Sequence, residues 1–211
     1  MAASTPTPIA IELHQLGHEF LEGKPVFRGV SSEIKAGTHA VINGKNGSGK
    51  STLGKILSGQ LTATEGTIAW NQNDADLPQQ ELLLEASFTG PSASLHPHLS
   101  IEEILRFHGT FRNWRQGANP VASLHSAGLQ PHMHVRFSEL SSGMKQRVLL
   151  TVSLCTASGL IVLDEPCANL DRAGIDWYRE QLMAFPAQTT LVICTNDRKE
   201  DYIQADVTLS L

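Results

Sequence analysis

The fold of this chain is decided by the run Gly44-Lys45-Asn46-Gly47-Ser48-Gly49-Lys50-Ser51-Thr52. It has the pattern G-x-x-x-x-G-K-[ST], and it lies between an apolar run at 39–42 and a helix-like stretch at 51–57. Glycines allow backbone N–H groups to turn toward phosphate oxygens, and the start of a helix adds a positive dipole end. The order of strand, loop and helix therefore predicts a phosphate-binding loop rather than a tight turn without a ligand.

All residues of this loop, Gly44 to Thr52, are candidate nucleotide-binding residues. Lys50 is expected to reach the β- and γ-phosphates of a nucleotide. Ser51 is expected to offer its hydroxyl oxygen to Mg²⁺.

Composition and charge are those of a folded domain. The 211 residues are 41% hydrophobic and 18% charged, and we expect one domain over 1–211 with a lobe inserted in it. A net charge of −5 disfavours the binding of nucleic acid. Cys155, Cys167 and Cys194 have no C-x-x-C spacing and are expected to be reduced core thiols. No apolar stretch reaches the ~18 residues that span a bilayer, so a membrane role would require a partner protein.

Apolar runs alternate with helix-like segments along most of the chain. Strands are predicted at 9–13, 29–34, 38–42, 67–70, 82–88, 160–163 and 190–194, and helices at 51–58, 118–128, 142–156 and 173–183. Ser100 and Glu103 have the spacing of a capping box, which predicts a further helix from Ser100 to about Phe107. Buried strands that alternate with helices indicate a mainly parallel sheet. The segment at about 97–140 is predicted to be a mostly helical insertion.

Two carboxylates follow the apolar strand predicted at 160–163. That strand would place Asp164 at its carboxyl end, where ligands bind in open α/β sheets. Asp164 can hold Mg²⁺, directly or through water, and Glu165 can orient a water molecule toward the γ-phosphate. Such a run is often only the end of a strand, but together with the phosphate loop it predicts a site.

The segment before the helix at 142–156 is a second candidate for anion binding. Ser141, Ser142 and Gly143 leave backbone N–H groups free at a helix start. From these residues alone, an ordinary serine N-cap is the alternative explanation.

The order of these motifs resembles that of the ATP-binding cassette (ABC) ATPases, and in particular short bacterial members of the haem-exporter-like type. The run from Leu140 to Arg147 is similar to the family's Leu-Ser-Gly-Gly-Gln signature. Ala168-Asn169-Leu170-Asp171 is similar to the family's D-loop. The resemblance extends from about residue 9 to residue 205.

This resemblance implies an α/β fold of the P-loop NTPase class, with a mainly parallel core sheet, an antiparallel β subdomain and an inserted helical subdomain. It implies that ATP and Mg²⁺ are bound and that Phe20 stacks on the adenine; a core phenylalanine at a strand end is the alternative. It also implies a head-to-tail dimer. In that dimer each ATP lies between the phosphate loop of one subunit and Ser141 to Gly143 of the other.

The chain departs from the family's pattern at two positions of the site. Residues 89–94 lack the glutamine that the family has after the strand predicted at 82–88, and Thr89 or Ser92 is the substitute considered. Asn196 stands where the family has a histidine; its amide can hydrogen-bond a phosphate but cannot be protonated. With Lys50 and Glu165, Asn196 completes the predicted catalytic set. We expect hydrolysis to be slow.

The predicted function is that of an ATP-binding and ATP-hydrolysing subunit that powers a membrane ABC transporter through ATP-driven dimerisation. The resemblance implies a transmembrane permease partner and a homodimer, or a heterodimer with another ABC subunit. It places the chain in the cytoplasm, peripheral on the inner face of the membrane. The alternatives are a nucleotide-binding protein with little or no turnover and a non-transport ABC ATPase.

Overall fold

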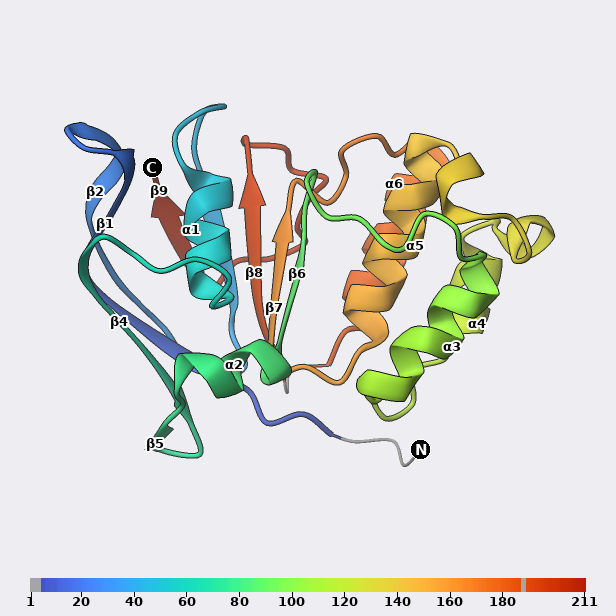
Figure 1. Cartoon of the computed structure of the whole chain (residues 1–211), viewed down its shortest axis with the longest axis horizontal. Helices are drawn as coiled ribbons and strands as arrows, with labels where there is room; N and C mark the ends of the chain where they lie inside the picture. The colour runs from blue at the N-terminus through green and yellow to red at the C-terminus, as the bar shows by residue number, and fades with distance from the viewer. Residues whose placement is uncertain (1–4, 187–188) are drawn as a thin grey trace.

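The computed structural model describes residues 5–186 and 189–211. Two β-sheets and a lobe of helices follow one another across the molecule (Figure 1). The first sheet is antiparallel, with four strands in the order β2-β1-β4-β5. Its strands are β1 (Ala10–Leu21), β2 (Lys24–Ile34), β4 (Glu65–Gln72) and β5 (Ala75–Asp76).

The second sheet is parallel and is the frame of the candidate site. Its five strands have the order β6-β7-β8-β3-β9, and every neighbouring pair is parallel. The carboxyl ends of these strands therefore meet at one edge of the sheet. The strands are β3 (His39–Asn43), β6 (Ala86–Thr89), β7 (Leu160–Asp164), β8 (Thr190–Thr195) and β9 (Val207–Ser210).

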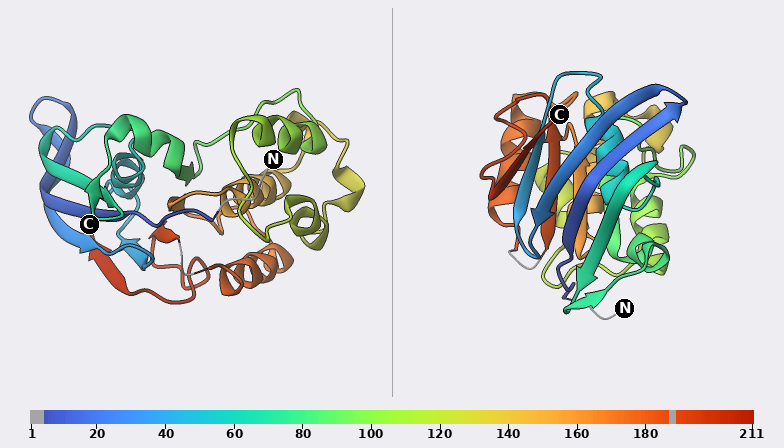
Figure 2. Two further views of the ribbon diagram at one scale, coloured as in Figure 1. Left: turned by 90° about the horizontal axis from the view of Figure 1, so that it is seen from below. Right: turned by 90° about the vertical axis from the view of Figure 1, so that its left-hand side faces the viewer.

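Helices cover both faces of the parallel sheet and form the lobe farthest from the antiparallel sheet (Figure 2). Helix α1 lies on one side of strands β6 to β8, and α5 and α6 lie on the other (Figure 1). The α-helices are α1 (Lys50–Leu57), α2 (Gln79–Glu85), α3 (Ile101–Phe111), α4 (Pro120–Ser126), α5 (Ser142–Cys155) and α6 (Arg172–Met183). Two short 3₁₀ helices cover Gln130–His132 and Phe137–Glu139.

Strand β7 contributes side chains to two hydrophobic clusters, one on each face of the parallel sheet. Leu160 and Val162 belong to the cluster around α1 and the antiparallel sheet, whereas Ile161 and Leu163 belong to the cluster of the helical lobe. This alternation follows because successive side chains of a strand point to opposite faces. The predicted fold class, a mainly parallel sheet with an antiparallel β part and a helical part, is confirmed.

The helices of the lobe begin with caps that the sequence signals. Ser100 Oγ accepts a hydrogen bond from the Glu103 N–H at 3.3 Å, and Glu103 Oε2 accepts one from the Ser100 N–H at 2.8 Å. This is the predicted capping box at the start of α3. The Asn119 side chain caps α4, and Pro120 occupies its first turn.

The strand predicted at 82–88 is wrong in its first half. Residues up to Glu85 form α2, which begins after the extended Pro78, and β6 starts only at Ala86. Leu82 is the buried residue of this helix, whereas Leu83 and Leu84 are exposed. Three consecutive leucines have no period that separates a one-sided helix from a buried strand, which explains the error.

Other elements differ from the prediction in length only, or were not predicted. Strands β1 and β2 extend from the predicted 9–13 and 29–34 to the turn at 22–23. The edge strand β9 and the two-residue β5 were missed. Cys155, Cys167 and Cys194 are buried and unpaired, as predicted. In the part of the chain that the structure describes, no helix has the length and apolarity needed to cross a membrane.

His108, near the end of α3, is held as a neutral base. Its Nε2 lies 2.8 Å from Thr156 Oγ1, and that hydroxyl donates to the Val152 carbonyl at 2.6 Å. Because the hydroxyl hydrogen is used in that bond, we assign the imidazole hydrogen to Nε2. Burial, with a smaller effect from the positive charge of Arg112, lowers the pKa of His108 to about 4.

We expect the free energy of unfolding to fall as the pH decreases from 6.5, the ordinary pKa of histidine, toward 4. In this range the unfolded chain binds a proton at His108 and the folded chain does not, so added protons favour unfolding. Thermal melting above pH 6.5 and near pH 5 measures the effect, with His108→Gln as the comparison. The variant should lose less stability between these pH values than the native chain; an equal loss would contradict the assignment.

Candidate functional site

The loop from Gly44 to Gly49 connects β3 to α1. Gly47 and Gly49 have φ angles of +82° and +100°, a region that side-chain-bearing residues rarely adopt. A Cβ on Gly49 would lie 2.7 Å from Val26 Cγ1 and 3.0 Å from Phe27 Cδ1. Strand β2 thus packs directly against the loop, and position 49 requires glycine both for its backbone angle and for its space.

The side chain of Lys50 is held inside this loop. Its Nζ donates to the Gly44 carbonyl at 2.7 Å and to the Lys45 carbonyl at 3.0 Å, and the residue is 5% exposed. Ser51 and Thr52 follow in the first turn of α1, whose backbone N–H groups have no partner within the helix. A cation and a helix start at one place make an anion-binding arrangement.

Asp164 lies at the carboxyl end of β7 and is 2% exposed. Burial raises its pKa, and a hydrogen bond with the Ser51 side chain opposes this shift. Its Oδ1 atom is buried and has no hydrogen-bond partner among the described residues. An unsatisfied carboxylate oxygen next to a hydroxyl is the set of hard oxygen donors that Mg²⁺ prefers, so these two residues fit that ion.

Glu165 continues the chain beyond β7 in a strained backbone conformation. Its φ is +48°, which is unusual for a residue with a side chain. Its N–H donates to the Cys194 carbonyl of β8 at 2.9 Å. Such strain persists where surrounding structure enforces it, and it occurs at functional sites.

Asn196 follows β8 and is exposed. Its Nδ2 lies 3.5 Å from Asn46 Oδ1, so the structure brings this residue to the phosphate loop. Asn46 and Asn196 therefore present amide groups beside the loop. The loop residue Ser48 also has a buried Oγ without a partner among the described residues.

The segment after β6 passes close to Asp164. Gly90 comes directly after this strand, and a Cβ there would lie 2.8 Å from Asp164 Cβ and 3.2 Å from Asp164 Oδ2. A side chain at position 90 would therefore displace the carboxylate. The sequence did not reveal this contact, because nothing local marks a glycine that packs against a distant strand end.

Thr89 and Ser92, the expected substitutes for the glutamine, differ in exposure, and a glutamine before β6 is already hydrogen-bonded. Thr89 is buried within β6, and Ser92 is exposed beyond it. Gln79, at the start of α2, donates its amide to the Gly59 carbonyl at 2.8 Å. Gln79 is thereby engaged with the end of α1.

Phe20 is exposed near the turn between β1 and β2. Its ring meets the His18 ring edge to face, with centroids 4.6 Å apart. The hairpin that carries it also presents Val26 and Phe27 to Gly49, so Phe20 belongs to the part of the antiparallel sheet beside the loop.

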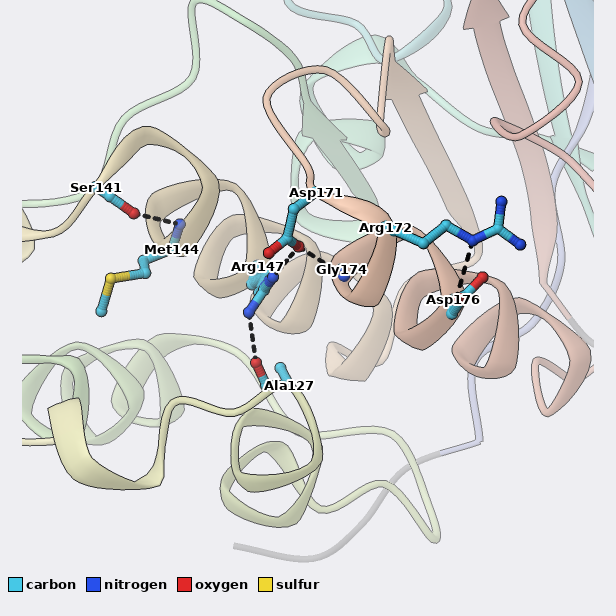
Figure 3. Close-up of polar contacts among 8 residues, drawn as sticks. All are labelled: Ala127, Ser141, Met144, Arg147, Asp171, Arg172, Gly174 and Asp176. Atoms are coloured by element: carbon cyan, nitrogen blue, oxygen red, sulfur yellow. Dashed lines mark hydrogen bonds and ion pairs between the residues drawn. The ribbon is translucent and has the colours of Figure 1, made fainter.

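Ser141, Ser142 and Gly143 form the start of α5, on the helical lobe. Ser141 Oγ accepts a hydrogen bond from the Met144 N–H at 3.3 Å (Figure 3). Both serines are exposed. Among the described residues, no hydrogen bond joins this segment to the loop of Lys50. The structure thus brings together Lys50, Ser51, Asp164, Glu165 and Asn196, but not the serines.

Helix α5 also holds the chain that follows Glu165. Gln146 Nε2 donates to the Pro166 carbonyl at 2.9 Å. Arg147 pairs with Asp171, and its Nη1 donates to the Ala127 carbonyl at 2.8 Å (Figure 3). The Gly174 N–H and then Arg147 lower the pKa of Asp171, which caps α6. These contacts of Gln146 and Arg147 were not predicted, because the partners are separated by many residues.

A family model described as ABC transporter matches residues 27–168. The chain is 31% identical over 194 residues to HrtA of Staphylococcus aureus strain Newman, named as a hemin import ATP-binding protein, with 86% of each chain covered. It is 32% identical over 171 residues to CcmA of Bradyrhizobium diazoefficiens, a cytochrome c biogenesis ATP-binding export protein, with 81% of this chain and 84% of that protein covered.

A solved structure of a bacterial Atm1-family ABC exporter with ATP bound has a TM-score of 0.79 to this chain. The match covers 99% of this chain and 38% of the exporter chain, at 20% sequence identity. This likeness therefore concerns the fold alone.

Proposed function

The chain belongs to the family of ABC transporter ATP-binding subunits, and we propose that it hydrolyses ATP in an ATP-driven dimer that powers a membrane permease. The observation that carries the proposal is the meeting of Lys50, Asp164 and Glu165 at one edge of the parallel sheet. There, the positive charge of Lys50 and the negative charge of Glu165 both act on the Asp164 carboxyl. A cation for phosphates, a metal-binding carboxylate and a second carboxylate are the groups that phosphoryl transfer to water requires.

In this proposal the phosphates of ATP lie on the backbone N–H groups of the loop from Gly44 to Thr52, with Lys50 at the β- and γ-phosphates. Ser51 and Asp164 would hold Mg²⁺. When bound, that ion would neutralise negative charge on the phosphate oxygens. Phe20 would stack on the adenine, since its exposed ring lies on the hairpin beside the loop.

Glu165 would accept the proton of the attacking water. Glu165 lies directly after β7, at the sheet edge where the phosphates would lie, in a strained backbone conformation of the kind found at functional sites. Asn196 would donate its amide hydrogens to the γ-phosphate, because the same amide already lies beside Asn46.

The position of Ser141 to Gly143 supports the proposed dimer. Their free N–H groups suit a γ-phosphate, but α5 and α1 lie on opposite sides of strands β6 to β8 (Figure 1). We therefore propose that they complete the site of a second subunit, in a homodimer or in a heterodimer with another ABC subunit. Residues 1–211 would act as one ATPase domain with a helical subdomain at about 97–140.

The permease partner would contact the loop at 90–98 and helix α3. Phe107 and Phe111 of α3 are exposed, and their rings stack edge to face with centroids 5.0 Å apart. An exposed aromatic pair suits a protein partner better than water. This contact would place the chain at the inner face of the cell membrane, on the cytoplasmic side.

Hydrolysis should be slow in the native chain, and Asn196→His should raise kcat by about tenfold. An imidazole can carry a positive charge to the γ-phosphate in the transition state, which an amide cannot. The measurement is phosphate release by the chain assembled with its membrane partner. Asn196→Ala is the matched control and should lower kcat further.

The same assay tests the proposed function itself. Tight ATP binding without hydrolysis in the assembled complex would show that the chain is a nucleotide-binding subunit with little turnover. That alternative is favoured by Asn196 and by the absence of a glutamine from residues 89–94.

A further inference from the structure

Asp201 is a fully buried carboxylate that the proposed mechanism does not use. It is 0% exposed. Within residues 5–186 and 189–211, no lysine, arginine or histidine nitrogen lies within 4.0 Å of its oxygens. A buried carboxylate without a cation is costly unless hydrogen bonds satisfy it. Its hydrogen bonds therefore indicate why it is tolerated.

Both carboxylate oxygens of Asp201 accept hydrogen bonds, one from the end of β8 and one from the turn after β7. Oδ2 accepts from the Thr195 hydroxyl at 2.6 Å, and Thr195 directly precedes Asn196. Oδ1 accepts from the Cys167 N–H at 3.1 Å, and Cys167 is the second residue after Glu165. A single side chain thus links Thr195, the last residue of β8, to the turn after β7.

The backbone around Asp201 is itself firmly held. The hydroxyl of Tyr178, a fully buried residue of α6, donates to the Asp201 carbonyl at 2.8 Å. Cys167 Sγ donates to the Glu200 carbonyl at 3.3 Å. Arg179, also on α6, donates to the Lys199 carbonyl at 3.1 Å. Asp201 is therefore attached to a rigid helix, which a link between these two segments requires.

We propose that Asp201 is a positioning residue for ATP hydrolysis, which fixes Glu165 relative to Asn196. The inference rests on the function proposed above. Strands β7 and β8 are held to each other by their own backbone ladder, so the Asp201 bonds are not needed to pair them. What these bonds add is the placement of the turns beyond the strand ends. A shift of about 1 Å at such a place can reduce a rate about a hundredfold.

The test is the kinetics of Asp201→Ala in the chain assembled with its membrane partner. We expect kcat to fall about tenfold to a hundredfold, whereas ATP affinity, measured with a fluorescent ATP analogue, should change less than about twofold. The phosphate loop makes none of these bonds, which is why binding should persist. Leu77→Ala, a core truncation in the antiparallel part of the protein, controls for a general loss of stability.

Variants of Thr195 test the link without removing the carboxylate. Thr195→Ser keeps the hydroxyl and should retain native kcat, whereas Thr195→Val removes it and should lower kcat. Combining Thr195→Val with Asp201→Ala should lower kcat less than the product of the two single effects, because both remove the same bond. These variants keep the proposal testable if Asp201→Ala fails to fold.

Hydrogen exchange of the nucleotide-free chain supplies a second measurement. Amides at 167–168 and 195–198 should exchange faster in Asp201→Ala than in the native chain and in Leu77→Ala. A native complex without ATP hydrolysis would overturn the proposed function, and this role with it. In a hydrolysing complex, unchanged exchange at both turns would overturn the role of Asp201 alone. The role of Asp201 would also be overturned if kcat and ATP affinity fell in parallel. The same holds if Asp201→Ala lowered kcat no more than Leu77→Ala does.

Discussion

Replacing Glu165 by glutamine should reduce ATP hydrolysis to the background rate and leave ATP binding intact. Glutamine keeps the size of the side chain but cannot accept the proton of the attacking water. Loss of a general base lowers a rate by about 10² to 10⁴-fold. Steady-state phosphate release measures the first effect, and equilibrium binding of ATP measures the second.

The same variant should accumulate as an ATP-bound dimer, because closure is no longer followed by hydrolysis. Size-exclusion chromatography with light scattering, with and without ATP, detects that species. Glu81→Gln changes an exposed glutamate of α2 in the same way and should behave as the native chain. If Glu165→Gln retained hydrolysis within about twofold of native, the carboxylate could not be the base.

Two variants that are inactive alone should recover ATP hydrolysis when they are mixed. Lys50→Ala removes the cation of the phosphate loop. Ser142→Glu places a negative charge where the partner's γ-phosphate would bind, and α5 should tolerate it because Ser142 is exposed and lies in the first turn. In the mixed dimer, one site combines the intact loop of one subunit with the intact serines of the other. Random pairing with independent sites gives about a quarter of the native rate.

A matched control separates recovery from simple addition of chains. Lys50→Ala mixed with the double variant Lys50→Ala, Ser142→Glu forms dimers in which no loop is intact, so that mixture should remain inactive. If Lys50→Ala and Ser142→Glu form mixed dimers that hydrolyse no ATP, the site is not shared between subunits. Native mass spectrometry of the mixtures reports whether mixed dimers are present.

Features that depend on neighbouring residues could be predicted from the sequence. The position of the phosphate loop between β3 and α1 could be predicted because its glycines and the apolar patterns on either side of it act within a few residues. The capping box of Ser100 and Glu103 has the predicted bonds for the same reason. The fold class follows from apolar strands that alternate with helices.

Features that depend on distant contacts could not be predicted. Gly90 gives no local sign that its missing side chain makes room for Asp164. The bond between Asn46 and Asn196 joins residues 150 positions apart, and only the sheet order brings β3 and β8 together. Helix α2 was predicted as a strand because the packing of a whole helix face decides that Leu82 is buried, and this packing cannot be read from neighbouring residues. The role proposed for Ser141 to Gly143 rests on the family resemblance, because no hydrogen bond among the described residues joins them to the loop of Lys50.

The carbonyls that hold Lys50 have a consequence for how quickly a nucleotide can be captured. A free lysine side chain carries about 2 kcal/mol of rotamer entropy. In this chain that disorder is lost when the protein folds, not when the ligand arrives. An incoming polyphosphate therefore meets a site in which the ammonium group of Lys50 is already in place. Binding then requires only that phosphate oxygens replace carbonyl oxygens as its hydrogen-bond partners.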